Sequence, residues 1–322
     1  MEKNYDVVAL GELLIDFTQN GISDQGNPLF EANPGGAPCN VLAMLKKLGK
    51  SCAFVGKVGD DMFGRSLRDT VASIGIDTGA LLFDQEVNTT LAFVQTFENG
   101  DRDFSFYRNP GADMMIRSDE IPEDVVKGAR VFHFGTLSMT HDAVRAATKK
   151  AVAIAKENGC LISFDPNLRP PLWSSLDAAK EQIKWGLSQC DILKIADNEI
   201  EFLSGSTDFD EGAAYLKKNF PNIRLINITA GPDGSYSYYE DKKVFVPAFQ
   251  LGGTIETTGA GDTFCASVLG FVLDNGLDGL TEADLCRMLR FANAAAYIVT
   301  TRKGAIRSMP ERSQVEAILS EN

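Results

Sequence analysis

Positive charge and long apolar runs are both scarce in this sequence. The 322 residues include 31 lysines and arginines against 44 acidic residues, which gives a formal net charge of −13. Nucleic acids and anionic membranes are bound through basic surface, which this composition does not favour. No apolar run in the sequence is long enough to cross a bilayer. We therefore expect a protein whose partner is neither nucleic acid nor a membrane.

Cysteine and histidine do not occur in the patterns that hold metals or disulfides. The six cysteines form no Cys-x-x-Cys pair, and two histidines, His133 and His141, are too few for a histidine-rich metal site. Most cysteines lie in or beside apolar runs, which is typical of buried thiols in a reducing compartment. Residues 1–6 have neither the basic nor the apolar part of a signal peptide. These observations predict a cytoplasmic location.

The sequence does contain a regular alternation of short apolar runs and helical patterns. Apolar residues make up 44% of the chain, which is enough for a sizeable core. The alternation is typical of an α/β protein with a mainly parallel central sheet. A length of 322 residues suits one large domain, 1–322, with an attachment. The expected strands lie at 6–12, 53–56, 131–135, 161–165, 192–195 and 224–229.

Two segments interrupt this alternation and predict a small additional sheet. Residues 19–33 are polar and form an excursion from the main fold, after a first strand that continues through residues 13–18. The runs 90–97 and 103–108 are rich in strand-forming residues and flank a turn at 98–102, so they predict a hairpin. Insertions at about 13–34 and 88–113 would then cover the strand ends as a lid. Arg108 either points from this hairpin toward a ligand or forms a surface ion pair.

Two glycine-containing turns precede predicted helices. Residues 257–262 read Thr-Thr-Gly-Ala-Gly-Asp and lead into a long apolar run, so backbone N–H groups at a helix N-terminus are exposed to an anion. Asp262 is placed to take a proton from an attacking hydroxyl, or it is a helix cap. Gly35 and Gly36 precede a helix over 41–49 and allow a ligand to approach the backbone, or they form a simple helix entry.

Polar residues follow one predicted strand after another. Ligands bind at the carboxyl ends of strands in open parallel sheets, so we expect these side chains to converge on one crevice. A single such residue would be structural, whereas the repeated placement indicates a site. The converging residues are Asp16, Asn40, Asn167, Arg169, Asn198, Glu201, Thr229 and Asp262. Asn293 lies within a largely helical stretch, 281–301, where the alternative is a core amide bonded to backbone.

These motifs resemble those of the ribokinase-like (PfkB) carbohydrate kinases. Residues 35–40, with 55–64 behind them, match the family's N-terminal signature, and 257–264 match its C-terminal one. Asn198-Glu199-Ile200-Glu201 matches the Asn-x-x-Glu motif. Within the family, the stretches 11–17, 106–113 and 165–173 are most similar to fructokinases. One departure is Glu256, near the monovalent-cation site, where the family usually has Asp.

The resemblance implies a three-layer α/β/α fold with a mainly parallel sheet and a small β-sheet lid that often forms a homodimer. It also implies ATP and Mg²⁺ and, often, K⁺. The sugar would be held by Asp16, Gly35, Gly36, Asn40 and Arg108. Asn167, Arg169, Asn198 and Glu201 would face the phosphates, with Glu201 toward the metal. The nucleotide would be lined by Thr229, Gly231, Gly234 and Asn293. Gly259, Ala260 and Gly261 would donate N–H groups to the transferring phosphoryl group, and Asp262 would be the base.

The substrate predicted from the resemblance is D-fructose, phosphorylated at its 6-hydroxyl. Alternatives are 2-keto-3-deoxygluconate and ribose-type sugars or nucleosides. A keto acid requires a cation for its carboxylate, which Asp16 would repel and only Arg108 would favour, and a nucleoside requires an aromatic slot. Two alternatives come from other classes of protein. A nucleotide sensor without turnover does not require Asp262, and a dinucleotide oxidoreductase requires Gly-x-Gly-x-x-Gly after the first strand, where Gly11 is followed by Glu12.

Overall fold

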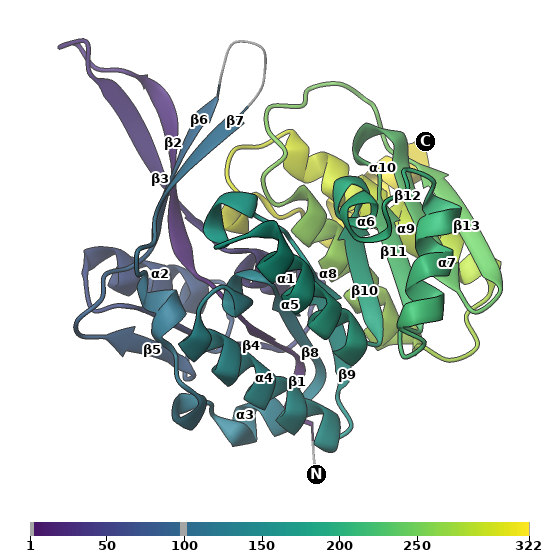
Figure 1. The fold of residues 1–322 in the computed structure, drawn as a ribbon. Coiled ribbons are helices and arrows are strands. Elements are labelled where there is room, and N and C mark those ends of the chain that lie inside the picture. The colour runs from purple at the N-terminus through teal and green to yellow at the C-terminus, as the bar shows by residue number, and fades with distance from the viewer. Residues whose placement is uncertain (1–2, 97–101, 322) are drawn as a thin grey trace.

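A large twisted sheet forms the centre of the computed structural model, which describes residues 3–96 and 102–321 (Figure 1). Among these residues nine strands pair in the order β13-β12-β11-β10-β9-β8-β1-β4-β5. All neighbours are parallel except β11–β12 and β12–β13, which form an antiparallel edge. The strands are β1 (Tyr5–Leu10), β4 (Cys52–Gly59), β5 (Leu81–Asp84), β8 (Ala129–Gly135), β9 (Leu161–Asp165), β10 (Ile192–Ala196), β11 (Leu225–Thr229), β12 (Gly234–Tyr239) and β13 (Lys242–Pro247).

Helices cover both faces of this sheet and complete three layers. One core contains residues of α1 (Ala37–Lys47), α2 (Met62–Ser73), α8 (Ala260–Asn275), α9 (Glu282–Thr300) and α10 (Arg312–Glu321). The other contains residues of α3 (Glu123–Lys127), α4 (Asp142–Glu157), α5 (Leu176–Gln189), α6 (Asp197–Ser204) and α7 (Phe209–Asn219). Successive strand residues alternate between the cores, because side chains of a strand point to opposite faces. In β1, for example, Val7 belongs to the first core and Val8 to the second.

A second, four-stranded sheet projects from one side of the main body (Figure 1). Its strands, in the order β3-β2-β6-β7, are β2 (Leu14–Ile22), β3 (Pro28–Gly35), β6 (Leu91–Thr96) and β7 (Arg102–Tyr107). We call it the small sheet. Its face carries an aromatic cluster in which the Phe17 and Phe93 rings stack with centroids 4.8 Å apart. The predicted fold class is thus confirmed, while the predicted turn at 98–102 lies outside the described residues except for Arg102, which begins β7.

Two local predictions differ from the structure. Residues 13–18 do not continue the first strand of the main sheet, because the chain leaves that sheet after Leu10 and enters β2 of the small sheet. The helix expected over 41–49 begins at Ala37, since Pro38 is well tolerated in a first helical turn. This earlier start places Asn40 within the first turn of α1.

The structure also bears on the expected burial of the cysteines and on the expected lack of a membrane-spanning segment. All six cysteines lie in the described part of the chain and are free, and five of them are buried, as their apolar neighbours predict. Over residues 3–96 and 102–321 we find no helix whose length and apolar character would let it span a membrane.

Candidate active site

The glycine-containing turn at 259–261 forms the N-terminus of α8. Gly259 precedes the helix with φ 78°, a left-handed conformation that favours glycine, and Ala260 and Gly261 occupy the first turn. The N–H groups of a first turn have no partner inside the helix, and the helix dipole adds positive potential there. The α8 terminus is therefore suited to an anionic group. Asp262 lies in the same turn and is buried.

Asp262 is held by an amide from α1. Asn40 Nδ2 donates to Asp262 Oδ2 over 2.7 Å, and both residues are buried. Burial raises the pKa of Asp262 to about 6, although the Asn40 hydrogen bond lowers it in part. Asn40 Oδ1 is also buried and has no hydrogen-bond partner among the described residues. The pair thus offers an oxygen acceptor and a carboxylate that is ionised at neutral pH to the same ligand.

Asp16 and the two glycines of the first motif lie together at the base of the small sheet. A Cβ on Gly35 would lie 2.2 Å from Asp16 Oδ2, so no other residue fits without moving this carboxylate. Gly36 has φ 123°, and a Cβ there would lie 2.3 Å from the Glu12 carbonyl oxygen. Asp16 retains some solvent exposure, yet the protein around it removes enough solvent to raise its pKa to about 7. The positive charge of Arg169 opposes this rise in the pKa of Asp16.

The loop after β9 brings positive charge to the same region. Arg169 lowers the pKa of both Asp16 and Asp262, so its guanidinium lies within electrostatic reach of both carboxylates. Asn167 has φ 43°, a left-handed conformation that is uncommon for residues other than glycine. Its N–H donates to Asp165 Oδ1 over 3.2 Å, which fixes this turn. An uncommon backbone conformation held in this way positions a side chain at a defined angle.

Asn198 and Glu201 lie on an exposed face of α6, three residues apart. Glu199 between them is buried and connects two loops: it accepts from Leu168 N over 2.7 Å and from Ala196 N over 2.8 Å. Burial raises the pKa of Glu199. Glu199 therefore ties the loop that carries Asn167 and Arg169 to the start of the helix that carries Asn198 and Glu201.

Arg108 is buried and committed to protein partners. Its Nε and Nη2 donate to Asp113 Oδ2 over 2.8 and 2.6 Å, Nη2 also donates to Leu137 O, and Nη1 donates to Thr140 Oγ1. The ion pair predicted as the alternative for Arg108 is present, but it is buried rather than on the surface. These bonds leave one N–H of Nη1 for a sugar hydroxyl, and the sugar contact stays a prediction.

The residues expected around the nucleotide lie near the antiparallel edge of the main sheet. Thr229 ends β11, and Gly231 and Gly234 flank the next turn. Gly234 has φ 129°, and a Cβ there would lie 2.2 Å from the Val246 carbonyl oxygen. Asn293 donates to the carbonyls of Val246 and Pro247 and accepts from Ser235, as expected of a core amide. Its side chain holds the β12–β13 hairpin against α9, and a contact with nucleotide stays a prediction.

Several charged residues at this site were not singled out from the sequence. Lys194 and Asp165 form a buried ion pair of 3.1 Å, Glu199 holds two loops, and the buried Glu12 accepts from Ala37 N over 2.8 Å. A signal was present, because Lys194 and Asp165 are charged residues inside or at the end of apolar strands. Such residues are seldom fully buried without a partner.

The resemblance assigns Glu201 alone to a metal. Across the described ranges, no three His, Cys, Asp or Glu side chains are grouped so as to hold an ion.

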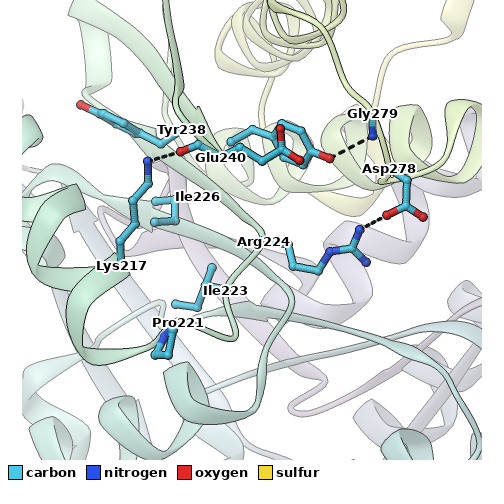
Figure 2. A pocket seen from close by; sticks show the side chains of 10 residues that line it. Lys217, Pro221, Ile223, Arg224, Ile226, Tyr238, Glu240, Asp278 and Gly279 are labelled. Carbon is cyan, nitrogen blue, oxygen red and sulfur yellow. Dashed lines mark hydrogen bonds and ion pairs between the residues drawn. The ribbon is translucent and has the colours of Figure 1, made fainter.

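A hollow of about 440 Å³ lies outside the candidate active site, beside the start of β11 (Figure 2). Its polar groups bond to one another: Lys217 Nζ donates to Glu240 O over 2.7 Å, and Gly279 N donates to Tyr239 Oη over 3.0 Å. Thr229 does not line this hollow and lies at the other end of β11.

The comparisons with known proteins identify the family. The family model described as pfkB family carbohydrate kinase matches residues 4–312. The chain belongs to the pfkB family of carbohydrate kinases. It is 41% identical to a probable fructokinase-4 of Arabidopsis thaliana over 98% of this chain and 97% of that one. The kinase is therefore a sugar phosphotransferase, as the signatures at 35–40, 55–64 and 257–264 predict.

Solved structures agree with this assignment. A fructokinase of Xylella fastidiosa with bound ATP is 29% identical and has a TM-score of 0.89 over 98% of this chain and 99% of that one. A fructokinase of Vibrio cholerae O395, in a form with bound fructose, ADP and calcium ion, is 30% identical with a TM-score of 0.86 over 98% and 99% of the two chains. The three-layer fold with its small sheet is thus the ribokinase-like fold.

Proposed function

We propose that this kinase transfers the γ-phosphoryl group of ATP to the 6-hydroxyl of D-fructose. One observation carries the proposal: a buried Asp262, with a pKa of about 6, lies in the first turn of α8 behind the Gly259–Gly261 turn. A base must be ionised at the working pH, and a pKa near that pH makes it effective. The N–H groups of the turn and the helix dipole suit the negative charge of the transferring group.

The proposed step assigns one role to each group. The 6-hydroxyl oxygen attacks the γ-phosphorus while Asp262 takes the hydroxyl proton, and the bond to the bridging oxygen of ADP breaks. Asn40 holds the Asp262 carboxylate through Nδ2 and accepts from a second sugar hydroxyl through its free Oδ1. Asp16 and the remaining N–H of Arg108 bind further hydroxyls, and Gly35 and Gly36 let the sugar approach the backbone. Most of the rate enhancement then comes from positioning and charge.

D-Fructose is favoured over 2-keto-3-deoxygluconate by charge at the sugar side. Asp16 repels the carboxylate of 2-keto-3-deoxygluconate, and the Arg108 charge is already paired with Asp113. The relatives named fructokinase at about 41% identity support the same substrate. A ribose-type sugar or a nucleoside stays the second candidate within the family.

Phosphoryl transfer also calls for a divalent cation, which we propose to be Mg²⁺. Mg²⁺ keeps several waters and usually takes one or two carboxylates together with substrate phosphates, and the exposed Glu201 beside Asn198 fits that requirement. When bound, the cation neutralises phosphate charge, while Asn167, Arg169 and Asn198 orient the phosphates and Thr229, Gly231, Gly234 and Asn293 lie along the nucleotide. For K⁺, Glu256 Oε1 already accepts from Gly304 N over 2.7 Å, which engages part of this carboxylate.

The proposal extends to the role of the small sheet and to the location of the protein. The small sheet, built from segments at about 13–34 and 88–113 of a single kinase domain, acts as a lid that excludes water from the transfer. Two copies pair through this lid, whose exposed apolar side chains include Ile22 and Phe30. The six free thiols suit a cytoplasmic protein.

A panel of separate acceptor substrates tests the proposed reaction. The kinase is incubated with ATP, Mg²⁺ and, in turn, fructose, ribose, adenosine or 2-keto-3-deoxygluconate, and kcat/KM is measured by ADP release. We expect the highest value for fructose, with fructose 6-phosphate as the product, and slow ADP release without sugar. A higher value for another member of the panel contradicts the substrate, and equal ADP release with and without sugar contradicts the kinase reaction itself.

A further inference from the structure

A group of buried polar side chains lies on the α8 face of the main sheet. In β8, β9 and β10 the apolar residues Phe132, Phe164 and Leu193 belong to the core on the opposite face. The polar residues that alternate with them therefore face α8. These polar residues are His133, Ser163, Asp165 and Lys194, and each of them is buried. Elsewhere the same face packs apolar side chains such as Val131 and Ile192 against the helices.

Lys194 brings this polar group into contact with the first turn of α8. Its Nζ lies 3.1 Å from Asp165 Oδ2 and 3.3 Å from Asp165 Oδ1. A Cβ on Gly261 would lie 3.1 Å from Lys194 Nζ, so the ammonium of this β10 residue lies close to the backbone of the first turn of α8. The side chain of Lys194 is only 8% exposed. Nothing in the proposed reaction yet uses this cation.

The charges around Lys194 explain why it stays protonated. Burial on its own would lower the pKa of the ammonium, but Asp165, Glu199 and Asp262 outweigh burial and raise it. His133 shares the same surroundings, and burial together with the Lys194 charge lowers its pKa to about 3, so the imidazole is neutral. Lys194 is therefore the cation shared by three carboxylates, one of which is Asp262.

Groups on several neighbouring elements raise or lower the pKa of Asp262. Lys194 from β10 and Arg169 from the loop after β9 favour its ionised form, as does the Asn40 amide from α1, whereas Asp165 from β9 opposes it. Asp16 from β2 is a further carboxylate that interacts with it, and Cys265 on α8 is a buried thiol beside it. Of the two cations, Lys194 is the one fixed by a buried ion pair.

We propose that Lys194 is a positioning residue for phosphoryl transfer, which keeps Asp262 ionised and the first turn of α8 in place below the transferring group. This inference rests on the proposed role of Asp262 as the base. A cation in a region shielded from water favours a neighbouring carboxylate far more than it would in solvent. Asp165 fixes the ammonium by direct contact and offsets part of its charge.

A charge cycle tests the proposal. We would measure the pH dependence of kcat/KM for fructose, at saturating ATP and Mg²⁺, in the unmodified kinase, Lys194→Met, Asp165→Asn and the double variant. The acidic limb of the unmodified kinase is expected at about pH 6. Lys194→Met should move the limb upward by about one unit or more and regain activity toward about pH 9, because Asp165 and Asp262 then face each other without the cation. Asp165→Asn should move it downward, and the double variant should return to within about half a unit.

Two results would overturn the proposal. In one, Lys194→Met lowers kcat/KM equally at every pH, as a purely structural residue would. In the other, the limb stays in place while KM for ATP rises, as a phosphate-binding residue would. Ionisation of ATP is common to all four proteins and cancels in the comparison. The double variant removes the charge of Asp165 together with its cation, so it leaves one buried carboxylate fewer unpaired than Lys194→Met and reports on the cycle even if that variant unfolds.

A readout without turnover separates this inference from the proposed reaction. The carboxyl pKa of Asp262 is measured by ¹³C NMR in the same four proteins, with its resonance assigned by loss in Asp262→Asn. Opposite shifts in Lys194→Met and Asp165→Asn support the inference even if fructose is not phosphorylated, in which case only the reaction fails. An unchanged Asp262 pKa in both single variants overturns the inference even if fructose is a substrate.

Discussion

At the scale of single residues, Glu12 is expected to make stability depend on pH. It is 3% exposed, and burial raises its pKa to about 7 from an ordinary value of 4.5. The folded chain thus holds this proton more tightly than the unfolded chain, so unfolding free energy falls as pH rises between these values, by at most about 3 kcal/mol. Glu12→Gln cannot ionise and still accepts from Ala37 N. We expect it to be more stable than the unmodified kinase at about pH 8 but not at about pH 4.5.

Urea unfolding at both pH values measures this difference. The raised pKa values of Asp16 and Asp262 also make stability fall as pH rises, but they do so equally in both proteins. The difference in unfolding free energy between Glu12→Gln and the unmodified kinase therefore reports on Glu12 alone. Glu316→Gln, on the exposed side of α10, is the matched control and should change neither value. Equal stability of Glu12→Gln and the unmodified kinase at pH 8 would contradict the account.

Residues of the site differ in how well their sequence surroundings predict them. Asn40 and Asp262 each belong to a turn with its own local pattern, and the structure joins them although they are 222 positions apart. Their roles stay predictions. The apolar segments around Lys194 and Glu12 indicate that these charged residues are unusual, but the partner that permits the burial of each comes from elsewhere in the chain. No local pattern encodes such pairs.

At the scale of elements, Arg108 fastens the end of β7 to the main body. It bonds to Asp113 in the following turn and to Leu137 and Thr140 after β8, so Arg108→Ala leaves the Asp113 carboxylate buried without its cation. We expect a loss of about 3–5 kcal/mol of unfolding free energy, as for other buried pairs that lose one partner. The double variant Arg108→Ala/Asp113→Ala should recover part of this loss.

The same pair of variants separates anchoring from sugar binding. If the remaining N–H of Arg108 reaches the sugar, KM for fructose stays raised in the double variant while KM for ATP does not. A double variant with normal KM for fructose would show that Arg108 only anchors the strand. Arg117→Ala removes a surface arginine whose side chain is 60% exposed, and it should alter neither stability nor KM.

Helices and strands were predicted best where the hydrophobic periodicity of the sequence is sustained. Apolar runs predicted β1, β4, β8, β9, β10 and β11 of the main sheet, whereas β5, β12 and β13 were not predicted. The segment that forms β2 and β3 was predicted to join a small sheet, but its two strands were not delimited, because seven of the eight residues of β3 are exposed or half-buried and show no apolar period. The α1 start was missed because Pro38 and the glycines before it resemble a loop, although proline is common in a first turn.

At the scale of the whole molecule, the small sheet is expected to hold two copies together. Ile22, Leu29, Phe30 and Tyr107 are 59, 48, 43 and 66% exposed there, which is a large apolar area for a free surface. Sedimentation velocity should show a dimer that Phe30→Lys dissociates. Leu176→Lys replaces an exposed apolar residue of α5, outside the small sheet, and should leave the dimer intact. A monomeric unmodified kinase, or equal dissociation by both variants, would contradict this assembly.

The central claim is that Asp262 is the base for sugar phosphorylation at the N-terminus of α8. The most direct measurement compares Asp262→Asn with the unmodified kinase, with kcat followed by fructose 6-phosphate formation and sugar binding followed by calorimetry. Asparagine keeps the shape and an oxygen acceptor for Asn40 but cannot take a proton. We predict that kcat falls by a factor of about 10²–10⁴ while the Kd for fructose changes little. A near-normal kcat in Asp262→Asn would contradict the claim.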